Sequence, residues 1–247
     1  MPKIDISVLM SVYNNDKTLK KSTESVLNQE FKNFEFLIID DGSRDASWEI
    51  LNKFSKKDKR IRLFKNNKRK GLAYSLNKII KKSRGKYLAR MDADDFSKKN
   101  RFKIQIEFLQ KNKEIDLVGS MAKTFEGKIL IVPKDDNLIK KTIIKKNPFI
   151  HPSIMARRNF FIKNRYNPKY SKCQDYELWL RVYRNHKFYN INKVLLLYNK
   201  SKIDFKTVII TFKIMTLNVC KEKNRKLKSI FYTMYNLSIN LIKFILK

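Results

Sequence analysis

The sequence predicts an α/β fold in which a mostly parallel sheet is flanked by helices and followed by a basic helical extension at the C-terminus. Three observations lead to this class. Short apolar runs alternate with amphipathic segments from residue 6 to residue 91, which is typical of alternating strands and helices. The segments between them are short, as in units whose parallel strands are joined by a helix. Beyond residue 205 the pattern becomes helical, with nine basic residues and one acid.

Four strands and three helices are expected in the first half of the chain. The strands are nearly continuous apolar runs, as in sheets covered on both faces, and comprise residues 6–12, 34–39, 61–64 and 86–91. The first helix begins at the capping residues 14–16 and ends near Gln29. The second is capped by Asp45, and the third runs from Gly71 to Ile80.

The pattern changes beyond Phe96, where we expect a mixed or antiparallel portion of the sheet. Strands are predicted for residues 115–121, 129–132 and 194–198, and helices for residues 102–110, 137–146 and 175–186. The chain therefore divides into a folded domain of residues 1–202 and a tail of residues 203–247.

Two interpretations of the tail stay open. Residues 229–242 carry no charge and follow five basic residues, Lys221, Lys223, Arg225, Lys226 and Lys228. A basic amphipathic helix can lie in the interface of an anionic membrane. The same apolar stripe can equally pack on the folded domain.

The composition bounds the class of protein. The chain has 247 residues, of which 43% are hydrophobic, including 17 Phe and 11 Tyr, so it can bury a core. Its two cysteines, Cys173 and Cys220, cannot form a disulfide framework. Neither a signal peptide nor a spanning helix is expected. We therefore expect the protein in the cytoplasm, either free or at the inner face of the cell membrane.

The net charge of +33 favours an anionic partner, which can be nucleic acid, anionic lipid or a phosphate-bearing substrate. Only 13 of the 56 basic residues are Arg, although dedicated phosphate recognition favours Arg. A biased base composition explains the lysine excess equally well. Because the sequence has no zinc-finger or RNP-like motif, no specific nucleic acid is expected.

Acidic and aromatic residues follow three of the predicted strands. Tyr13 follows the first strand, Asp40 and Asp41 the second, and the segment Asp92-Ala93-Asp94-Asp95 the fourth. Ligands of open parallel sheets bind beyond the carboxyl ends of the strands. Mg²⁺ and Mn²⁺ prefer oxygen ligands, and clustered carboxylates repel one another unless a cation compensates. The acidic segment therefore predicts a divalent cation site.

Simpler interpretations accompany these residues. Tyr13 can be a core or rim aromatic, and Asp40 to Ser43 can be a plain β-turn. Neither a dinucleotide-binding glycine motif nor a P-loop occurs in the sequence, so a glycine-rich loop does not cradle a phosphate here. A metal held by acids is the remaining route to phosphate binding.

Several segments resemble those of the family 2 glycosyltransferases of GT-A fold. The opening of that family is similar to Ile6-Ser7-Val8-Leu9-Met10-Ser11-Val12-Tyr13-Asn14, to Glu24-Ser25-Val26-Leu27-Asn28-Gln29 and to residues 38–45. Asp92-Ala93-Asp94-Asp95 resembles its D-x-D metal motif. His151-Pro152-Ser153 and residues 174–181 (QDYELWLR) resemble its later acceptor-side motifs. The resemblance covers residues 4–198 in order and spacing.

The resemblance implies transfer of a sugar, hexosyl or N-acetylhexosaminyl, from a nucleotide-diphosphate donor such as a UDP-sugar. It implies that the acceptor would be a hydroxyl of a surface polysaccharide, lipopolysaccharide, capsule or lipid-linked glycan, and that the configuration would invert. In this family Tyr13 would stack near the base, Asp40 and Asp41 would bind the donor, and Asp92 would contact the nucleotide. Asp94, with Asp92, would hold Mn²⁺ or Mg²⁺. Asp175 would be the general base.

The residues around Asp175 have structural interpretations as well. Asp175 itself can be an N-cap, and Glu177 with Arg181 is expected to be a structural i,i+4 pair. Trp179 is expected to pack beneath the acceptor side of the site. His151, held extended by Pro152, is either a packed loop histidine or an acceptor contact.

Two positions depart from the family pattern. Residues 197–202 (LYNKSK) lack the histidine of the family's Y-R-x-H segment, which Lys200 or Lys202 can replace. The arginine that faces the nucleotide aligns poorly, and Arg69 or Lys70 can serve. Two other classes stay open: a nucleotidyltransferase, and a basic, non-enzymatic nucleic-acid-binding protein.

Overall fold

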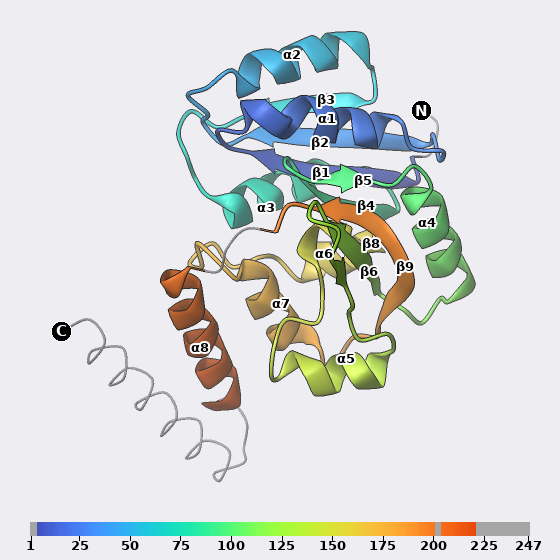
Figure 1. Cartoon of the computed structure of the whole chain (residues 1–247), viewed down its shortest axis with the longest axis vertical. Helices are drawn as coiled ribbons and strands as arrows, with labels where there is room; N and C mark the ends of the chain where they lie inside the picture. The colour runs from blue at the N-terminus through green and yellow to red at the C-terminus, as the bar shows by residue number, and fades with distance from the viewer. Residues whose placement is uncertain (1–3, 201–203, 221–247) are drawn as a thin grey trace, which may run out of the picture.

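The computed structural model describes residues 4–200 and 204–220 (Figure 1). The first half of the chain alternates strands with helices as predicted. The strands are β1 (Ile6–Val12), β2 (Phe34–Asp40), β3 (Ile61–Lys65) and β4 (Tyr87–Asp92). The helices between them are α1 (Asp16–Leu27), α2 (Ser47–Lys57) and α3 (Leu72–Lys82).

The second half adds short strands and helices to this core. Its strands are β5 (Phe96–Ser97), β6 (Leu117–Thr124), β7 (Ile129–Leu130), β8 (Met155–Arg157) and β9 (Phe188–Tyr198). Its helices are α4 (Arg101–Lys111), α5 (Asp136–Ile143), the 3-10 helix η1 (His151–Ser153), α6 (Arg158–Lys163), α7 (Gln174–Val182) and α8 (Phe205–Cys220). The predictions did not include β5, η1, β8 or α6, which are too short to carry a periodicity of their own.

The nine strands of the described residues belong to one sheet, in the order β3-β2-β1-β4-β8-β6-β9-β5, with β7 paired to β6. The four strands of the first half are parallel to one another. In the second half β8 is antiparallel to both β4 and β6, whereas β6 and β9 are parallel. This arrangement confirms the predicted α/β class, with its parallel first half and mixed second half.

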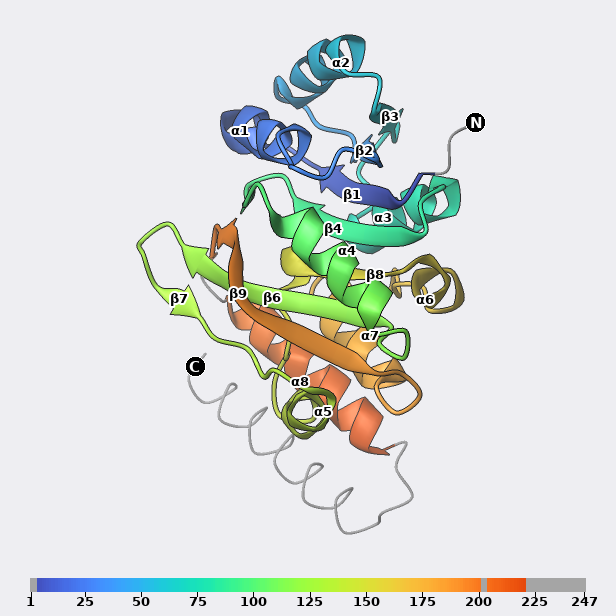
Figure 2. The same cartoon turned by 90° about the vertical axis from the view of Figure 1, so that its right-hand side faces the viewer.

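Helices cover both faces of the sheet and bury two apolar layers (Figures 1 and 2). Successive residues of β2 alternate between the layers, because strand side chains point to opposite faces. Ile38 belongs to the layer that includes residues of α1, α2 and α4, and Leu37 to the layer that includes residues of α3, α6 and α7. The continuous apolar runs that predicted the strands thus have a direct cause in this double coverage.

Several boundaries differ from the predictions, among them those of β6 (117–124 instead of 115–121), β7 (129–130 instead of 129–132) and α5 (136–143 instead of 137–146). β9 begins at Phe188 instead of 194. Its first half contains polar residues, which hid it from the prediction, and its pairing with β6 shifts register around Met121. α7 ends at Val182 instead of 186, because Asn185 turns back to donate to the Val182 carbonyl. Asp45 is not the cap of α2; the cap residue is Ala46. The Asp45 carboxylate instead accepts the Asp16 N–H at 3.0 Å and the Ser47 N–H at 3.1 Å.

The described part of the tail packs on the folded domain. Ile214 of α8 is completely buried, and Cys173 Sγ lies 3.3 Å from Thr211 Oγ1. The basic residues 221–228 and the uncharged residues 229–242 lie outside the described residues. No helix within the described ranges is long and apolar enough to cross a membrane.

Candidate active site

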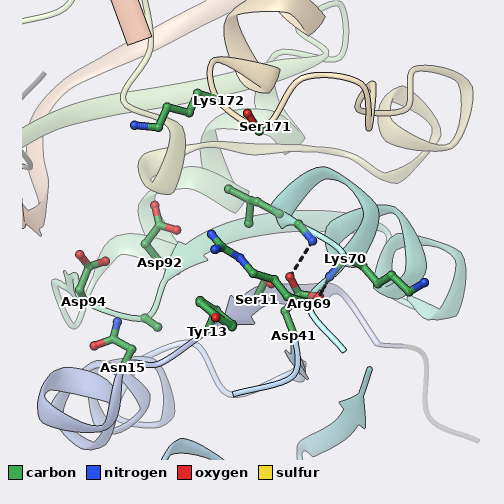
Figure 3. A pocket seen from close by; sticks show the side chains of 13 residues that line it. Ser11, Tyr13, Asn15, Asp41, Arg69, Lys70, Asp92, Asp94, Ser171 and Lys172 are labelled. Atoms are coloured by element: carbon green, nitrogen blue, oxygen red, sulfur yellow. Dashed lines mark hydrogen bonds between the residues drawn. The ribbon is translucent and has the colours of Figure 1, made fainter. Parts of the chain in front are cut away.

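A cavity of about 590 Å³ opens beyond the carboxyl ends of β1 and β4 (Figure 3). This is the edge at which open parallel sheets bind ligands. Its lining comes from five segments that are far apart in the sequence: Ser11, Tyr13 and Asn15; Asp41; Arg69 to Leu72; Asp92 to Asp94; and Ser171 with Lys172. The cavity therefore brings together most of the predicted donor-side residues.

Tyr13 and Arg69 form one wall of the cavity. The Arg69 guanidinium lies over the Tyr13 ring, 4.2 Å from its centroid, in the geometry of a cation–π contact. Arg69 is exposed and Tyr13 is half-buried, so both present surface to a ligand. A planar base and a phosphate are the chemical groups that suit such a pair.

The Asp41 carboxylate holds the segment that carries Arg69. It accepts the Lys70 N–H at 2.9 Å and the Gly71 N–H at 2.7 Å. The Asn66 amide and the Ser75 hydroxyl donate to the same carboxylate, each at 2.8 Å. Asp41 is 2% exposed, and these four internal bonds satisfy its oxygens. Its direct contribution is to fix the loop between β3 and α3.

Gly42 allows this loop to approach the end of β2. Its φ is +78°, which L-residues with side chains rarely adopt. A Cβ atom at this position would lie 2.7 Å from the carbonyl carbon of Lys68 and 2.8 Å from the nitrogen of Arg69. The loop after β2, at Asp41 and Gly42, thus packs closely against the backbone of the loop between β3 and α3, and is more than a plain turn.

Asp40 is fully buried at the end of β2 and does not line the cavity. Its Oδ1 accepts the Ser43 N–H at 3.3 Å. Its Oδ2 has no hydrogen-bond partner among the described residues. A buried acceptor without a partner is costly, and this one lies next in sequence to the cavity-lining Asp41.

The acidic loop after β4 rests on two buried arginines. The Arg90 guanidinium donates to Asp92 Oδ1 at 2.5 Å and to the Met91 carbonyl. Arg101 is completely buried and donates to the Arg90 carbonyl at 2.8 Å. Burial lowers the pKa of Arg101 to about 9, so this guanidinium keeps its positive charge at neutral pH. Both arginines therefore place donors and charge beneath the carboxylates.

Asn199, directly after β9, ties down the other two acids. Its backbone N–H donates to Asp95 Oδ1 at 2.7 Å, and its side-chain amide donates to Asp94 Oδ2 at 3.1 Å. Burial and the charge of Asp92 raise the pKa of Asp94, and the same causes raise the pKa of Asp95 to about 8. Asp95 Oδ2 has no partner within the described residues. The cluster therefore carries an electrostatic cost that a bound cation would relieve.

Asp175 lies in the first turn of α7, three positions after the cavity-lining Lys172. The cap of α7 is Cys173, whose φ is +56°, so the N-cap interpretation of Asp175 is wrong. Asp175 Oδ2 accepts the Asn147 amide at 2.7 Å. Burial raises the pKa of Asp175, and the charge of Asp92 raises it further. Asp175 is not among the residues that line the cavity.

The two acceptor-side candidates, His151 and Trp179, do not line the cavity. Trp179 is fully buried, and its ring packs edge-on against Phe149 at 5.4 Å. This position does not contact solvent. His151 Nε2 lies 2.8 Å from the Tyr166 hydroxyl, and burial lowers the pKa of His151 well below its usual value. His151 begins the 3-10 helix η1, so the extended conformation predicted for it is wrong.

The sequence model described as glycosyl transferase family 2 matches residues 7–191, which include β1, β2, β4 and α7. The chain belongs to glycosyl transferase family 2. This result confirms the resemblance and makes the protein an enzyme of the glycosyltransferase class. Neither the nucleotidyltransferase nor the non-enzymatic nucleic-acid-binding alternative holds.

Relatives and solved structures agree with this family and fold. The uncharacterized glycosyltransferase MJ1057 of Methanocaldococcus jannaschii is 37% identical over 207 residues, which are 80% of this chain and 71% of the relative. The O-antigen biosynthesis glycosyltransferase WbnJ of Escherichia coli is 31% identical over 209 residues, with 79% and 81% covered. S. aureus TarS in complex with UDP has a TM-score of 0.73 at 15% identity, with 94% and 70% covered. The mannosyltransferase PcManGT of Pyrobaculum calidifontis, in complex with GDP-Man and Mn²⁺, has a TM-score of 0.69 at 14% identity, with 94% and 69% covered.

Sequence reasoning missed several residues of this candidate site. Arg90 is hidden inside a strand that otherwise reads as apolar, and a charged residue there is itself a signal. Asn199 and Lys172 come from segments whose position depends on the second half of the sheet. Glu177 and Arg181 do form the expected structural pair, at 2.9 Å.

Proposed function

We propose that this family 2 glycosyltransferase moves a hexosyl or N-acetylhexosaminyl group from a nucleoside diphosphate sugar to an acceptor hydroxyl, with inversion at the anomeric carbon. One observation carries the proposal. The lining of the cavity includes Tyr13, Asp92 and Asp94, and it also includes Lys172, which precedes Asp175 by three positions at the start of α7. Binding groups for a nucleotide therefore lie together with the segment that leads to a candidate base.

The donor side of the cavity suits a nucleotide. The Tyr13 ring offers a stacking surface for the base, and Arg69 offers a guanidinium for phosphate. Asp40 Oδ2 is buried outside the cavity lining and has no partner in the described part of the chain, so it would contact the nucleoside only if the loop after β2 moves. Asp41 acts through the loop that carries Arg69. Because TarS is solved with UDP-GlcNAc and PcManGT with GDP-Man, we propose a UDP-sugar as donor, with a GDP-sugar as the alternative.

The acidic loop suits Mn²⁺ or Mg²⁺. Asp92 and Asp94 supply the hard oxygen ligands that these ions prefer, and Asp95 has an unpaired oxygen and a raised pKa that a cation would lower again. No group of three or more metal-binding side chains occurs in the described ranges. A site of one or two carboxylates completed by substrate phosphates is usual for Mg²⁺. When bound, the ion would neutralise negative charge on the diphosphate leaving group.

Asp175 is the proposed general base. The acceptor oxygen attacks the anomeric carbon while the bond from that carbon to the diphosphate oxygen breaks, and Asp175 takes the hydroxyl proton. A single displacement of this kind inverts the configuration. The Asn147 amide donates to Oδ2 of this carboxylate and fixes its orientation. The raised pKa of Asp175 makes its carboxylate a stronger base.

For the acceptor we propose a surface polysaccharide or lipid-linked glycan, because the relative WbnJ belongs to O-antigen biosynthesis. His151 and Trp179 would support the acceptor side from behind. The catalytic domain would comprise residues 1–202, acting in the cytoplasm, and residues 203–247 would hold it at the anionic inner face of the membrane. Flotation with anionic liposomes tests this location: a chain lacking residues 229–247 should no longer float, and equal flotation would reject the role of the tail.

The enzymatic proposal is tested by release of nucleoside diphosphate. The protein is incubated with Mn²⁺ and a panel of UDP- and GDP-sugars, with a lipid-linked glycan as acceptor. One donor should give turnover that both Asp94→Ala and Asp175→Asn abolish while their circular dichroism spectra stay unchanged. Asp135→Ala, at the cap of α5 and outside the cavity lining, serves as control and should retain turnover. Unchanged turnover of Asp175→Asn would reject the base assignment.

A further inference from the structure

Lys172 projects into the donor cavity from the segment that leads into α7. It lines the cavity together with Ser171. Figure 3 shows its side chain extending from the opposite wall, toward the side of the cavity where Asp92 and Asp94 lie. Arg69 and Lys70, the other two basic side chains of the lining, come from the donor side. Lys172 is therefore the basic group that faces them across the cavity.

Lys172 has an acidic partner that is easily exchanged. Its ammonium forms an ion pair with Asp204 Oδ2, and the two side chains are 40% and 53% exposed. Exposed pairs of this kind contribute little to stability. The other oxygen of Asp204 accepts the Thr207 N–H at 2.9 Å at the start of α8. Asp204 therefore keeps a function as a helix cap when Lys172 leaves.

A nucleoside diphosphate in this cavity would place two charged phosphates near Asp92 and Asp94. Those carboxylates repel phosphate, so cations from the protein are needed on the sides that a metal ion does not cover. Lys169, on the same segment as Lys172, does not line the cavity. Lys172 is also three positions before Asp175, the proposed base at the start of α7.

We propose that Lys172 binds the diphosphate of the donor and exchanges Asp204 for the phosphates when the donor enters. This proposal rests on the proposed function. A flexible, compact ammonium suits such an exchange, since Lys binds phosphate as a point charge and not as a fixed fork. The exchange would also link the occupied donor site to the first turn of α8, through Asp204.

The first experiment separates the diphosphate from the rest of the nucleotide. Binding of UDP, UMP and uridine to the full chain is measured by calorimetry in EDTA and again in Mn²⁺, with GDP, GMP and guanosine as the second series. Lys172→Met should weaken UDP binding about tenfold, an ordinary loss for one charge-assisted hydrogen bond. It should leave uridine binding unchanged. The matched control is Lys169→Met, an exposed lysine on the same segment, which should bind UDP like the unmodified chain.

The second experiment tests the exchange. Asp204→Asn removes the charge that competes for Lys172 but keeps a good cap for α8, so UDP should bind about two- to fivefold more tightly, the range expected from releasing an exposed ion pair. The double variant should bind like Lys172→Met alone. Equal loss of UDP and uridine in Lys172→Met, or UDP binding unaffected by it, would overturn the proposal. If the unmodified chain binds neither nucleotide series, the proposed function itself fails.

Discussion

Replacing Asp41 tests whether this buried carboxylate organises the donor side of the site. Asp41→Ala leaves four donors without their acceptor: the N–H groups of Lys70 and Gly71, the Asn66 amide and the Ser75 hydroxyl. Each buried donor that loses its partner costs about 1–3 kcal/mol. Because Asp41 borders the cavity, water can enter and satisfy part of this set. We therefore expect a loss of about 3–5 kcal/mol in the free energy of unfolding, as for a broken buried charge pair.

Asp41→Asn gives a graded result because the two carboxylate oxygens have different partners. Oδ1 accepts from Lys70, Asn66 and Ser75, whereas Oδ2 accepts from Gly71 alone. An asparagine that keeps its oxygen at the Oδ1 position opposes the Gly71 N–H with a donor. The expected loss is about 1–3 kcal/mol, the cost of one unsatisfied buried group.

Urea unfolding followed by circular dichroism measures these changes, and UDP binding reports on the loop that carries Arg69. The control is Asp135→Ala, which removes a helix cap bond to the Leu138 N–H at 2.9 Å and should cost about 1 kcal/mol without weakening UDP binding. The reasoning is refuted if Asp41→Ala is no less stable than this control. It is equally refuted if Asp41→Ala unfolds earlier but still binds UDP with the original affinity.

Three further predictions concern single residues. Gly42→Ala should lower the free energy of unfolding by about 1–3 kcal/mol, because φ is +78° and its Cβ would meet the Lys68 backbone; equal urea midpoints would contradict this. Asp175→Asn should lower kcat about 10²–10⁴-fold and leave UDP affinity unchanged. In the unmodified enzyme, kcat should fall as the pH drops through the raised pKa of Asp175. The acid limb of the pH profile should therefore lie above the usual aspartate pKa of about 3.9. Asp95 has a folded-state pKa of about 8, so in EDTA its ionisation should make the protein less stable as pH rises from about 4 to 8; Asp95→Asn should flatten that dependence in thermal melts, and identical slopes would exclude this origin.

The sequence was sufficient to predict the first half of the fold because each signal there is local. β1, β2 and β4 are buried on both faces, so their apolar runs are continuous and end where the polar site residues begin. Asp92 and Asp94 could be singled out because acids are rare in this chain and repel one another when clustered. A turn interpretation of Asp41 and Gly42 could be replaced only when the loop at residues 68–71 was seen to pack against them.

The second half depends on contacts that no local pattern contains. β8 and β5 have three and two residues, and they exist because β4, β6 and β9 offer edges for them to pair with. Asn199 reaches Asp94 and Asp95 only because β9 runs beside β5 and ends at the acidic loop. The sequence predicted that Asp175 lies at the start of a helix. It did not predict that Cys173, in a left-handed conformation, caps that helix.

The site combines two halves of the chain with different physical tasks. The parallel strands supply the proposed donor side, where Asp41 and Gly42 fix the loop of Arg69 and the buried Arg90 lies beneath the acids. The second half supplies Asp175 and the links that hold it in place, namely Asn147 to Asp175 and Lys172 to Asp204. The donor-side bonds are buried and so are costly to break, whereas the Lys172 pair is exposed and weak. Movement on donor binding is therefore expected on the side of α7 and α8, and the parallel half should stay fixed.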